Sequence, residues 1–246
     1  METSIPTSLS YLQDSYSFES FAVVLQLIEL DEGICEIVLD TTIFYPQGGG
    51  QPSDFGRVVV NDVWFNVKKV RFDNGLVYHI GTFENGLFNE GDKVQLQVDK
   101  SNRIENCKNH TAGHLVDVAM INCGYDFKPT KGYHFKDSPY VEYDGVIPAE
   151  ERENAKNTLE KEANRLIGLG AEISSFIVED PALLSEHCNF VPDYIPEGKP
   201  IRVVKVAGIG CPCGGTHIKK LSELSTFNIT KIKLKGGKTR INYRAN

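Results

Sequence analysis

Residues 1–100 carry short apolar runs separated by strong turn signals. The runs are rich in valine, isoleucine, phenylalanine and tyrosine, and turns such as Asp73-Asn74-Gly75 separate them. Strands are therefore expected at 23–30, 34–39, 58–60, 63–70, 76–80 and 94–98. Many short strands joined by close turns are typical of a small β-barrel.

The pattern changes near residue 100, where helical periodicity begins. Positions suited to a buried stripe recur at spacings of three and four, namely Ile104, Cys107, Thr111, Leu115 and Val118. Asp99 or Ser101 can cap the start of this helix, and Gly124 can end it. A second helix is expected at 149–167, and strands at 172–178, 201–207, 227–234 and 238–243. We therefore predict two domains, a β domain at 1–100 and a domain of mixed helices and strands at 101–246.

Composition excludes several classes of protein. The chain has 246 residues, of which 41% are hydrophobic and 24% charged, and these fractions exclude collagen-like, disordered and membrane classes. The longest apolar run, 21–30, is interrupted by Gln26 and Glu29 and falls short of the roughly 20 residues that a membrane span needs. The first residues lack a basic region followed by an apolar one, and the six cysteines are too scattered for a disulfide scaffold. We expect a cytoplasmic protein with reduced thiols.

Charge is distributed unevenly along the chain. The net charge of −7 combines −9 over residues 1–100, −8 over 101–198 and +10 over 199–246. A basic terminal segment on an acidic body is the footprint of a surface that binds a polyanion. Alternation then predicts that Lys231, Lys233 and Lys235 lie on one face of a strand, whereas Ile232 and Leu234 point toward the core.

The basic face continues beyond a turn predicted at Gly236-Gly237. Lys238, Arg240 and Arg244 follow this turn with the same alternation. The phosphate backbone of a nucleic acid would fit such a face. The alternative is a solvated basic surface without a ligand.

Two pairs of metal-binding side chains stand at the same spacing. His110-Thr-Ala-Gly-His114 lies inside the first predicted helix, where a spacing of four places both imidazoles on one face. Cys213-Gly-Gly-Thr-His217 repeats the spacing downstream, and a thiolate with imidazoles is a ligand set typical of zinc. The alternative is that these histidines are packed in the core without a metal. Four protein ligands would indicate a closed structural site and three with a water a catalytic one, and both remain open.

Other titratable residues near these motifs are weaker candidates. Cys211 could substitute as a ligand, but we expect it to be a bystander. His79, His134 and His187 have no partner at ligand spacing and are expected to be surface or core histidines. Asp117, three residues after the second histidine of the pair, could hold that ring in place or could be solvated.

A glycine-rich motif precedes the helix. The sequence at 44–54 is Phe-Tyr-Pro-Gln-Gly-Gly-Gly-Gln-Pro-Ser-Asp, and its three glycines permit close approach of a ligand or of another backbone segment. The motif is neither a phosphate-binding loop nor a dinucleotide fingerprint. A hairpin bulge would explain it equally well. Gln51 could place an amide at a polar site or satisfy the loop backbone.

Taken in order, the three motifs resemble the editing region of alanyl-tRNA synthetases. The chain lacks the length for the domains that activate the amino acid and charge the tRNA. It is therefore more similar to the freestanding alanyl-tRNA editing proteins, the AlaX family, in the longer form with an N-terminal domain. The resemblance extends over roughly residues 20–244.

This resemblance implies a fold, an activity and a site. The fold would be a small β-barrel akin to those of translation factors, followed by an α+β editing domain with helices packed on an antiparallel sheet. The activity would be hydrolysis of the ester that links a wrong amino acid, serine or glycine, to tRNA(Ala). Thr111 would contact the serine hydroxyl, and Gln51 would lie near the site. The implied Zn²⁺ ligands are His110, His114, Cys213 and His217.

Two departures and two rival functions belong with this hypothesis. Gly113 stands where a larger residue is more usual, and Thr130 stands near where synthetases more often have glutamine. A zinc-stabilised tRNA-binding module without catalysis is one rival. A different metallohydrolase is the other, although no His-Glu-x-x-His helix supports it. The residues expected to bind mischarged tRNA(Ala) are Lys231, Lys233, Lys235, Lys238 and Arg240.

Overall fold

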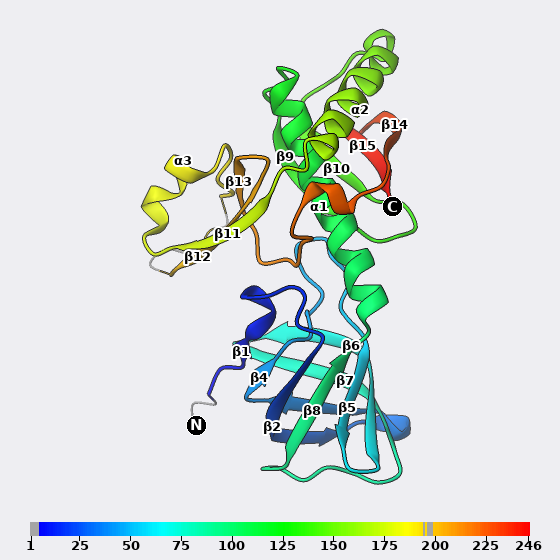
Figure 1. The fold of residues 1–246 in the computed structure, drawn as a ribbon, viewed down its shortest axis with the longest axis vertical. Helices are drawn as coiled ribbons and strands as arrows, with labels where there is room; N and C mark the ends of the chain where they lie inside the picture. The colour runs from blue at the N-terminus through cyan, green and yellow to red at the C-terminus, as the bar shows by residue number, and fades with distance from the viewer. Residues whose placement is uncertain (1–4, 194, 196–198) are drawn as a thin grey trace. The chain divides into compact units, whose positions relative to one another are not determined.

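The structure, a computed structural model, describes residues 5–193, 195 and 199–246. The chain divides into two compact units, Met1–Ile104 and Glu105–Asn246 (Figure 1). A closed antiparallel barrel, antiparallel sheets and few helices confirm the predicted α+β class with a small barrel. Among the described residues, no helix is long and apolar enough to cross a membrane.

Six antiparallel strands close the barrel of the first unit in the order β2-β3-β7-β6-β5-β8. Their bounds are β2 (Glu19–Glu29), β3 (Cys35–Leu39), β5 (Gly56–Val60), β6 (Val63–Asp73), β7 (Leu76–Glu84) and β8 (Lys93–Val98). Asn74 and Gly75 have φ angles of 48° and 86°, the left-handed conformation that a two-residue hairpin between β6 and β7 needs. Each of these strands confirms one expected from the apolar pattern. A separate parallel pair consists of β1 (Ser8–Leu9) and β4 (Thr41–Thr42).

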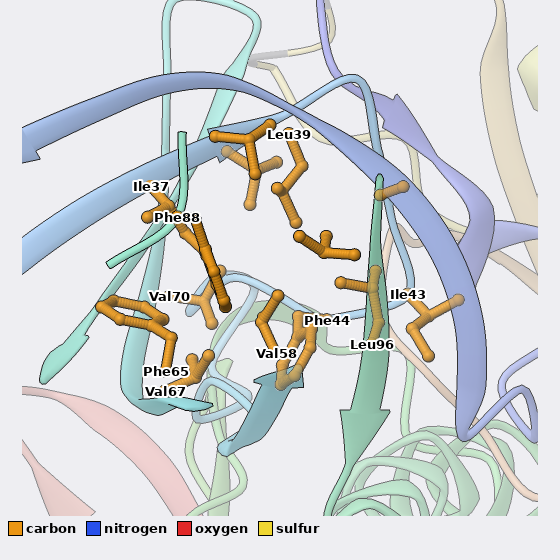
Figure 2. Packing of buried hydrophobic residues seen from close by; sticks show 14 of the residues in the cluster. Ile37, Leu39, Ile43, Phe44, Val58, Phe65, Val67, Val70, Phe88 and Leu96 are labelled. Carbon is orange, nitrogen blue, oxygen red and sulfur yellow. The ribbon is translucent and has the colours of Figure 1, made fainter. Parts of the chain in front are cut away.

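Branched and aromatic side chains fill the interior of the barrel (Figure 2). Ile37, Leu39, Val58, Phe65 and Leu96 are completely buried there. A closed barrel has no free strand edge, and a barrel of this size is packed by its own side chains. The barrel interior is therefore the hydrophobic core of the first unit.

A buried ion pair joins the glycine motif to the first turn of the long helix within the first unit. The side chains of Asp54 and Arg103 have no exposed surface, and the Nε atom of Arg103 lies 3.0 Å from both carboxylate oxygens. The guanidinium also donates to two backbone carbonyl oxygens. Asp54 accepts a further hydrogen bond from the backbone N–H of Tyr45 at 2.6 Å. Both charges are therefore hydrogen-bonded as well as paired, which burial requires.

Helices and antiparallel sheets make up the second unit. The helices are α1 (Lys100–Asn122), which begins before the division between the units, α2 (Arg152–Gly168) and α3 (Leu184–His187). The larger sheet has the order β14 (Phe227–Lys235), β15 (Lys238–Ala245), β10 (Tyr140–Asp144) and β9 (Lys128–Tyr133). The smaller sheet has the order β11 (Ile173–Val178), β12 (Ile201–Val206) and β13 (Ile209–Pro212). Short 3₁₀ turns lie at Ser10–Leu12, Asp31–Gly33, Ala149–Glu151, Pro181–Leu183 and Leu221–Glu223.

Local signals in the sequence set the ends of the helices. The carboxylate of Asp99 accepts a hydrogen bond from the backbone N–H of Asn102 at 2.8 Å and so caps α1. Gly124 has a φ of 82°, the left-handed conformation that commonly follows a helix. The predicted second helix is confirmed, with a 3₁₀ turn as its first part. Its buried stripe is Ala155, Leu159, Ala163 and Leu166, as the periodicity predicts.

The structure corrects one detail of the predicted basic strand. Leu234 was expected to point toward the core, but it is 44% exposed. It lies one residue before the end of β14, which is an edge strand of the sheet. Its neighbour Ile232, further from the turn, is buried as expected. Because an edge strand is covered less completely near its end, alternation alone does not decide whether a residue there is buried.

Candidate metal centre

Helix α1 brings His110 and His114 together. The residues are one turn apart, and their rings stack with centroids 5.1 Å apart. His110 is 2% exposed, and the side chain of His114 is 12% exposed. The expected arrangement of two imidazoles on one face of a helix is therefore present.

The loop after β13 carries the second pair, Cys213 and His217. Arg202 on β12 holds this loop: its Nη1 atom donates to the carbonyl oxygens of Cys213 and Gly215, each at 2.9 Å. The backbone N–H of Cys213 donates in turn to the carbonyl oxygen of Arg202 at 3.0 Å. The loop is thus tied to a strand on both sides of the thiol, which fixes where the sulfur lies.

The two pairs meet in one cluster. One ligand atom from each of His110, His114, Cys213 and His217 lies within 4.8 Å of all the others. The Sγ atom of Cys213 is 3.6 Å from Nε2 of His110 and 3.4 Å from Nε2 of His217. Tetrahedral zinc, with bonds of about 2.0 Å to nitrogen and about 2.3 Å to sulfur, separates such atoms by roughly 3.5 Å. These two sulfur–nitrogen distances therefore fit a four-coordinate metal ion.

Two further observations support this fit. The Nε2 atom of His114 is buried and has no hydrogen-bond partner among the described residues, which is costly unless a metal takes its lone pair. The other ring nitrogen, Nδ1, lies 3.8 Å from a carboxylate oxygen of Asp117. A carboxylate behind a ligating histidine is a common feature of metal sites because it orients the ring.

Thr111 lies behind another member of the cluster. It is completely buried, and its Oγ1 atom lies 3.1 Å from Nδ1 of His217 and accepts the backbone N–H of Ile218 at 3.3 Å. A hydrogen bond from Nδ1–H to this oxygen leaves the lone pair of Nε2 free for a metal. The expected contact between Thr111 and serine stays a prediction. Its observed partners favour a role in orienting His217.

Burial keeps the imidazoles neutral. It lowers the pKa of His110 and His217 well below the ordinary value, with the neighbouring histidines adding to the effect, and it lowers the pKa of His114 to about 4. Burial also raises the pKa of the Cys213 thiol. Neutral imidazoles are ready to ligate a cation, whereas the thiol must release its proton on binding. Metal binding at this cluster should therefore release a proton.

Sequence reasoning missed the position of a fourth histidine in this region. His134 is 5% exposed, and its ring stacks on that of His110 with centroids 4.6 Å apart. Its Nδ1 atom lies 2.6 Å from the hydroxyl of Tyr243, which donates to the carbonyl oxygen of Asn109 at 2.8 Å. His134 was expected to be a surface or core histidine without a metal partner, and it is a buried one that supports a candidate ligand. No spacing in the sequence relates it to His110.

The same ring explains the glycine inside α1. A Cβ atom added at Gly113 would lie 2.3 Å from Cε1 of His134 and 3.1 Å from the hydroxyl of Tyr243. The departure noted at Gly113 therefore makes room for a neighbouring side chain in the second unit.

A pocket opens beside the cluster, with His114 and Asp117 in its wall. Further lining comes from α1, β9, β13 and the segment after α3, and most of it is apolar. Burial raises the pKa of Asp117 to about 7, and its carboxylate accepts a hydrogen bond from the hydroxyl of Tyr143 at 2.5 Å. Cys211, expected to be a bystander, lines this pocket and is not part of the four-residue cluster.

Two other residues singled out from the sequence have different surroundings. Thr130 is exposed on β9, and its hydroxyl contacts Glu142. Gln51 belongs to the first unit and is completely buried, and its backbone pairs with that of Gly48 in a tight turn. A place for Gln51 near the cluster stays a prediction.

The predicted basic residues share one face of the larger sheet. Lys231, Lys233 and Lys235 on β14 stand opposite Asn242, Arg240 and Lys238 on β15. Lys231 and Lys235 are exposed, whereas Lys233 and Lys238 are partly buried. The alternation that placed the three lysines on one face is thus present.

Arg240 differs from the lysines because the protein itself binds its guanidinium. It donates to the carboxylate of Glu142 at 2.9 Å and lies 3.8 Å over the ring of Tyr140. Its side chain is only 12% exposed. The lysines are therefore more available to a polyanion than Arg240 is.

Comparisons with known proteins show which family the chain belongs to. The family model described as tRNA synthetases class II (A) matches residues 17–102, so the barrel region is similar to part of a class II synthetase. The alanyl-tRNA editing protein AlaX-M of Methanosarcina barkeri is 31% identical over 246 residues, which cover 96% of this chain and 98% of that protein. The chain belongs to the family of alanyl-tRNA editing proteins, as its motifs suggest.

Other relatives are longer than this chain. The alanyl-tRNA editing protein AlaX-L of Pyrococcus horikoshii is 29% identical over 231 residues, and the match spans 53% of that protein. The alanine–tRNA ligase of Haloquadratum walsbyi is 30% identical over 243 residues, and the match spans 26% of its length. The chain thus spans about half of the first relative and a quarter of the second.

Proposed function

We propose that the protein is a trans-editing hydrolase that removes a wrong amino acid, serine or glycine, from tRNA(Ala). The observation that carries this proposal is the cluster of His110, His114, Cys213 and His217 in a chain that matches an alanyl-tRNA editing protein over nearly its full length. The editing chemistry is assigned to residues 101–246. Residues 1–100 are proposed to form the domain that contributes the glycine motif and Gln51.

The cluster is proposed to hold Zn²⁺. A zinc ion bound there would supply Lewis-acid polarisation of the ester carbonyl or of a water molecule. The chain's own residues orient the ligands: Asp117 lies behind His114, Thr111 behind His217, and the loop is tied to β12. Neutral imidazoles add no positive charge that would repel a cation, and the buried thiol can lose its proton to become a thiolate ligand.

We propose that the tRNA binds to Lys231, Lys233, Lys235 and Lys238. These cations share a face of the larger sheet, and most of the remaining chain is acidic. Each lysine that neutralises a phosphate releases condensed counterions, so binding should weaken steeply with salt. Arg240 would contribute less because Glu142 and Tyr140 already bind its guanidinium.

The decisive experiment is a deacylation assay with seryl-, glycyl- and alanyl-tRNA(Ala). We expect release of serine or glycine, little release of alanine, and loss of the activity with a chelator or in Cys213→Ser. Cys123→Ser is the matched control, since that cysteine lies outside the cluster near the end of α1. Binding of tRNA(Ala) without release of any amino acid would favour the zinc-stabilised binding module.

The RNA-binding face is tested by the salt dependence of binding. Replacing Lys231, Lys233 and Lys235 with alanine should reduce the slope of log affinity against log salt by as much as about 3, or close to one per lost phosphate contact. The control replaces Lys156 and Lys161 on α2 and should leave the slope unchanged. An unaltered slope in the triple variant would place the RNA on another surface.

A further inference from the structure

We infer that the outer face of the larger sheet binds a single-stranded part of the RNA, and that Phe135 stacks on an unpaired base there. This inference rests on the proposed function and names the kind of RNA structure that binds beside the lysines of β14. The site is separate from the metal-binding cluster. The evidence is a stack of aromatic rings on the same face of the sheet as the lysines.

Strand register defines this outer face, because directly paired residues on neighbouring strands share a face of a sheet. Two rows of paired residues cross the sheet from β9 to β14. They are Tyr133, Tyr140, Asn242 and Lys231, and then Lys131, Glu142, Arg240 and Lys233. The row between them contains Val141, Ile241 and Ile232, which are buried on the opposite face. The outer face is therefore the one turned away from these core residues.

Aromatic rings form a continuous stack on the outer face. The rings of Tyr133 and Tyr140 lie 5.4 Å apart between centroids, with an angle of 17° between their planes. Phe135 stacks on Tyr133 with centroids 4.5 Å apart and an angle of 12°. The guanidinium of Arg240 lies 3.8 Å from the centre of the Tyr140 ring. Because β10 lies between β9 and β15, Tyr133 and Arg240 approach Tyr140 from opposite sides.

Phe135 is the end of this stack at which a base can be added. Among the described residues its ring contacts one other ring, that of Tyr133, and the side chain is only partly buried. Every base has a π-face, and stacking on aromatic rings is how proteins hold single-stranded RNA. A base inside a duplex is already stacked on its neighbours. Phe135 is therefore suited to an unpaired base.

The charges on the outer face suit the phosphates of such a strand. Lys131 and Lys231 are exposed, and the carboxylate of Glu142 between them is paired with Arg240 at 2.9 Å. Neighbouring strands lie about 4.8 Å apart, so β9 and β14 are separated by roughly 14 Å across three intervals. One RNA strand can therefore reach both Phe135 and the lysines of β14. Aromatic rings beside a row of cations are the combination that binds single-stranded nucleic acid.

The base held by Phe135 is not the one next to the scissile ester. His134 lies between Tyr133 and Phe135 in the chain, and its ring stacks on that of His110 with centroids 4.6 Å apart. Successive side chains of an extended segment point to opposite sides. Phe135 and the cluster are therefore on opposite sides of this segment, and the nucleotide at Phe135 contributes to binding and not to the chemistry.

The first experiment measures binding of labelled oligouridine and of an RNA duplex of the same length by fluorescence anisotropy. Phe135→Leu keeps an apolar side chain but removes the ring. Its affinity for oligouridine should fall at least roughly five-fold, the low end for loss of one base–aromatic stack, with duplex binding unchanged. Phe135→Tyr keeps a ring and should bind like the wild type. Phe72→Leu is the matched control, because Phe72 lies on the barrel and is 51% exposed.

The salt dependence separates stacking from a merely structural role. Stacking releases no counterions, so Phe135→Leu should lower the affinity for oligouridine by the same factor at every salt concentration. Replacing Lys231, Lys233 and Lys235 should instead change the slope of log affinity against log salt. A distorted sheet in Phe135→Leu would displace these lysines and change the slope as well, and circular-dichroism melts would detect it.

A second measurement uses the wild-type protein alone and remains valid if Phe135→Leu fails to fold. The fluorescent base 2-aminopurine, whose emission falls when it stacks, replaces one uridine of the oligonucleotide at a time. We expect binding to quench the emission at one position at least. Unchanged emission at every position would overturn the inference.

Neither measurement requires deacylation activity. If the protein releases no serine from tRNA(Ala) but binds oligouridine through Phe135, the proposed function fails and the RNA-binding face stands. If it deacylates seryl-tRNA(Ala) while Phe135→Leu binds oligouridine as the wild type does, the function stands and the inference is wrong. Equal losses in Phe135→Leu and Phe135→Tyr would also overturn it. Tighter binding of poly-L-glutamate than of oligouridine would assign the face to an acidic peptide instead.

Discussion

The buried ion pair of Asp54 and Arg103 allows a quantitative prediction about the stability of the first unit. Replacing Asp54 with asparagine keeps the size of the side chain and an oxygen for the N–H of Tyr45, but removes the charge that faces the guanidinium. Arg103 would then be an uncompensated charge with no exposed surface, held only by neutral acceptors. Breaking a buried ion pair in this way costs about 3–5 kcal/mol.

Urea unfolding can measure this loss within the first unit. Trp64 is the single tryptophan and lies on β6, so its fluorescence reports the barrel. With a denaturant slope of about 2 kcal/mol per molar urea, a loss of about 4 kcal/mol lowers the midpoint by roughly 2 M. Asp73→Asn is the control, because Asp73 faces Arg71 at 3.7 Å in a pair whose side chains are 56% and 37% exposed.

A control variant and a double variant test whether the buried ion pair stabilises the barrel. Asp73→Asn should cost less than about 1 kcal/mol, as exposed pairs do. Combining Asp54→Asn with Arg103→Met removes both charges and should recover part of the stability, which a double-mutant cycle measures as coupling. If Asp54→Asn costs no more than the control, or if the two replacements are additive, the pair does not stabilise the barrel as argued.

Three further outcomes are expected. Thr111→Val should weaken metal affinity about 10- to 100-fold in a chelator competition, because His217 loses the hydroxyl that orients its ring. A fall in the preference for serine over alanine at saturating metal would instead support contact between Thr111 and serine. Gly113→Ala should destabilise the second unit by about 1–3 kcal/mol in circular-dichroism melts, despite the better helix propensity, and an unchanged melt would contradict the clash with His134. Burial lowers the pKa of His79 from 6.5 to about 4. Between these two pH values the unfolded barrel therefore binds more protons than the folded one. The free energy of unfolding should rise by roughly 3 kcal/mol as the pH increases across that interval. His79→Gln should flatten this rise, and a slope that persists would assign it to another group.

The sequence was sufficient for the barrel because its strands are short apolar runs bounded by turn signals. It was not sufficient for β9, β10 and β13. The first of these contains Pro129 and Gly132, and the last is only four residues long, so neither carries a readable apolar pattern. β9 pairs with β10 and β13 pairs with β12, which are neighbours along the chain, and only β10 also pairs with a distant strand, β15. Local propensity does not encode such pairing.

The candidate ligands were predictable because each pair lies within one short motif. Their surroundings were not, because these form between distant positions. His134 and Tyr243 are 109 residues apart, and Asp117 and Tyr143 are 26 apart. Arg240 also shows that the partners of a side chain could not be predicted from the sequence. Its position in a basic strand suggested a phosphate contact, and only the folded sheet brings Glu142 and Tyr140 against it.

The two halves of the cluster also fix an order of events during synthesis. His110 and His114 leave the ribosome about a hundred residues before Cys213 and His217, and the last barrel strand, β8, ends at Val98. Since domains generally fold as units from the N-terminus, the barrel can be complete while a nascent chain still holds only two of the four ligands. A metal ion would then be captured only after Cys213 and His217 have emerged, so its tight retention would distinguish chains synthesised beyond residue 217 from shorter ones.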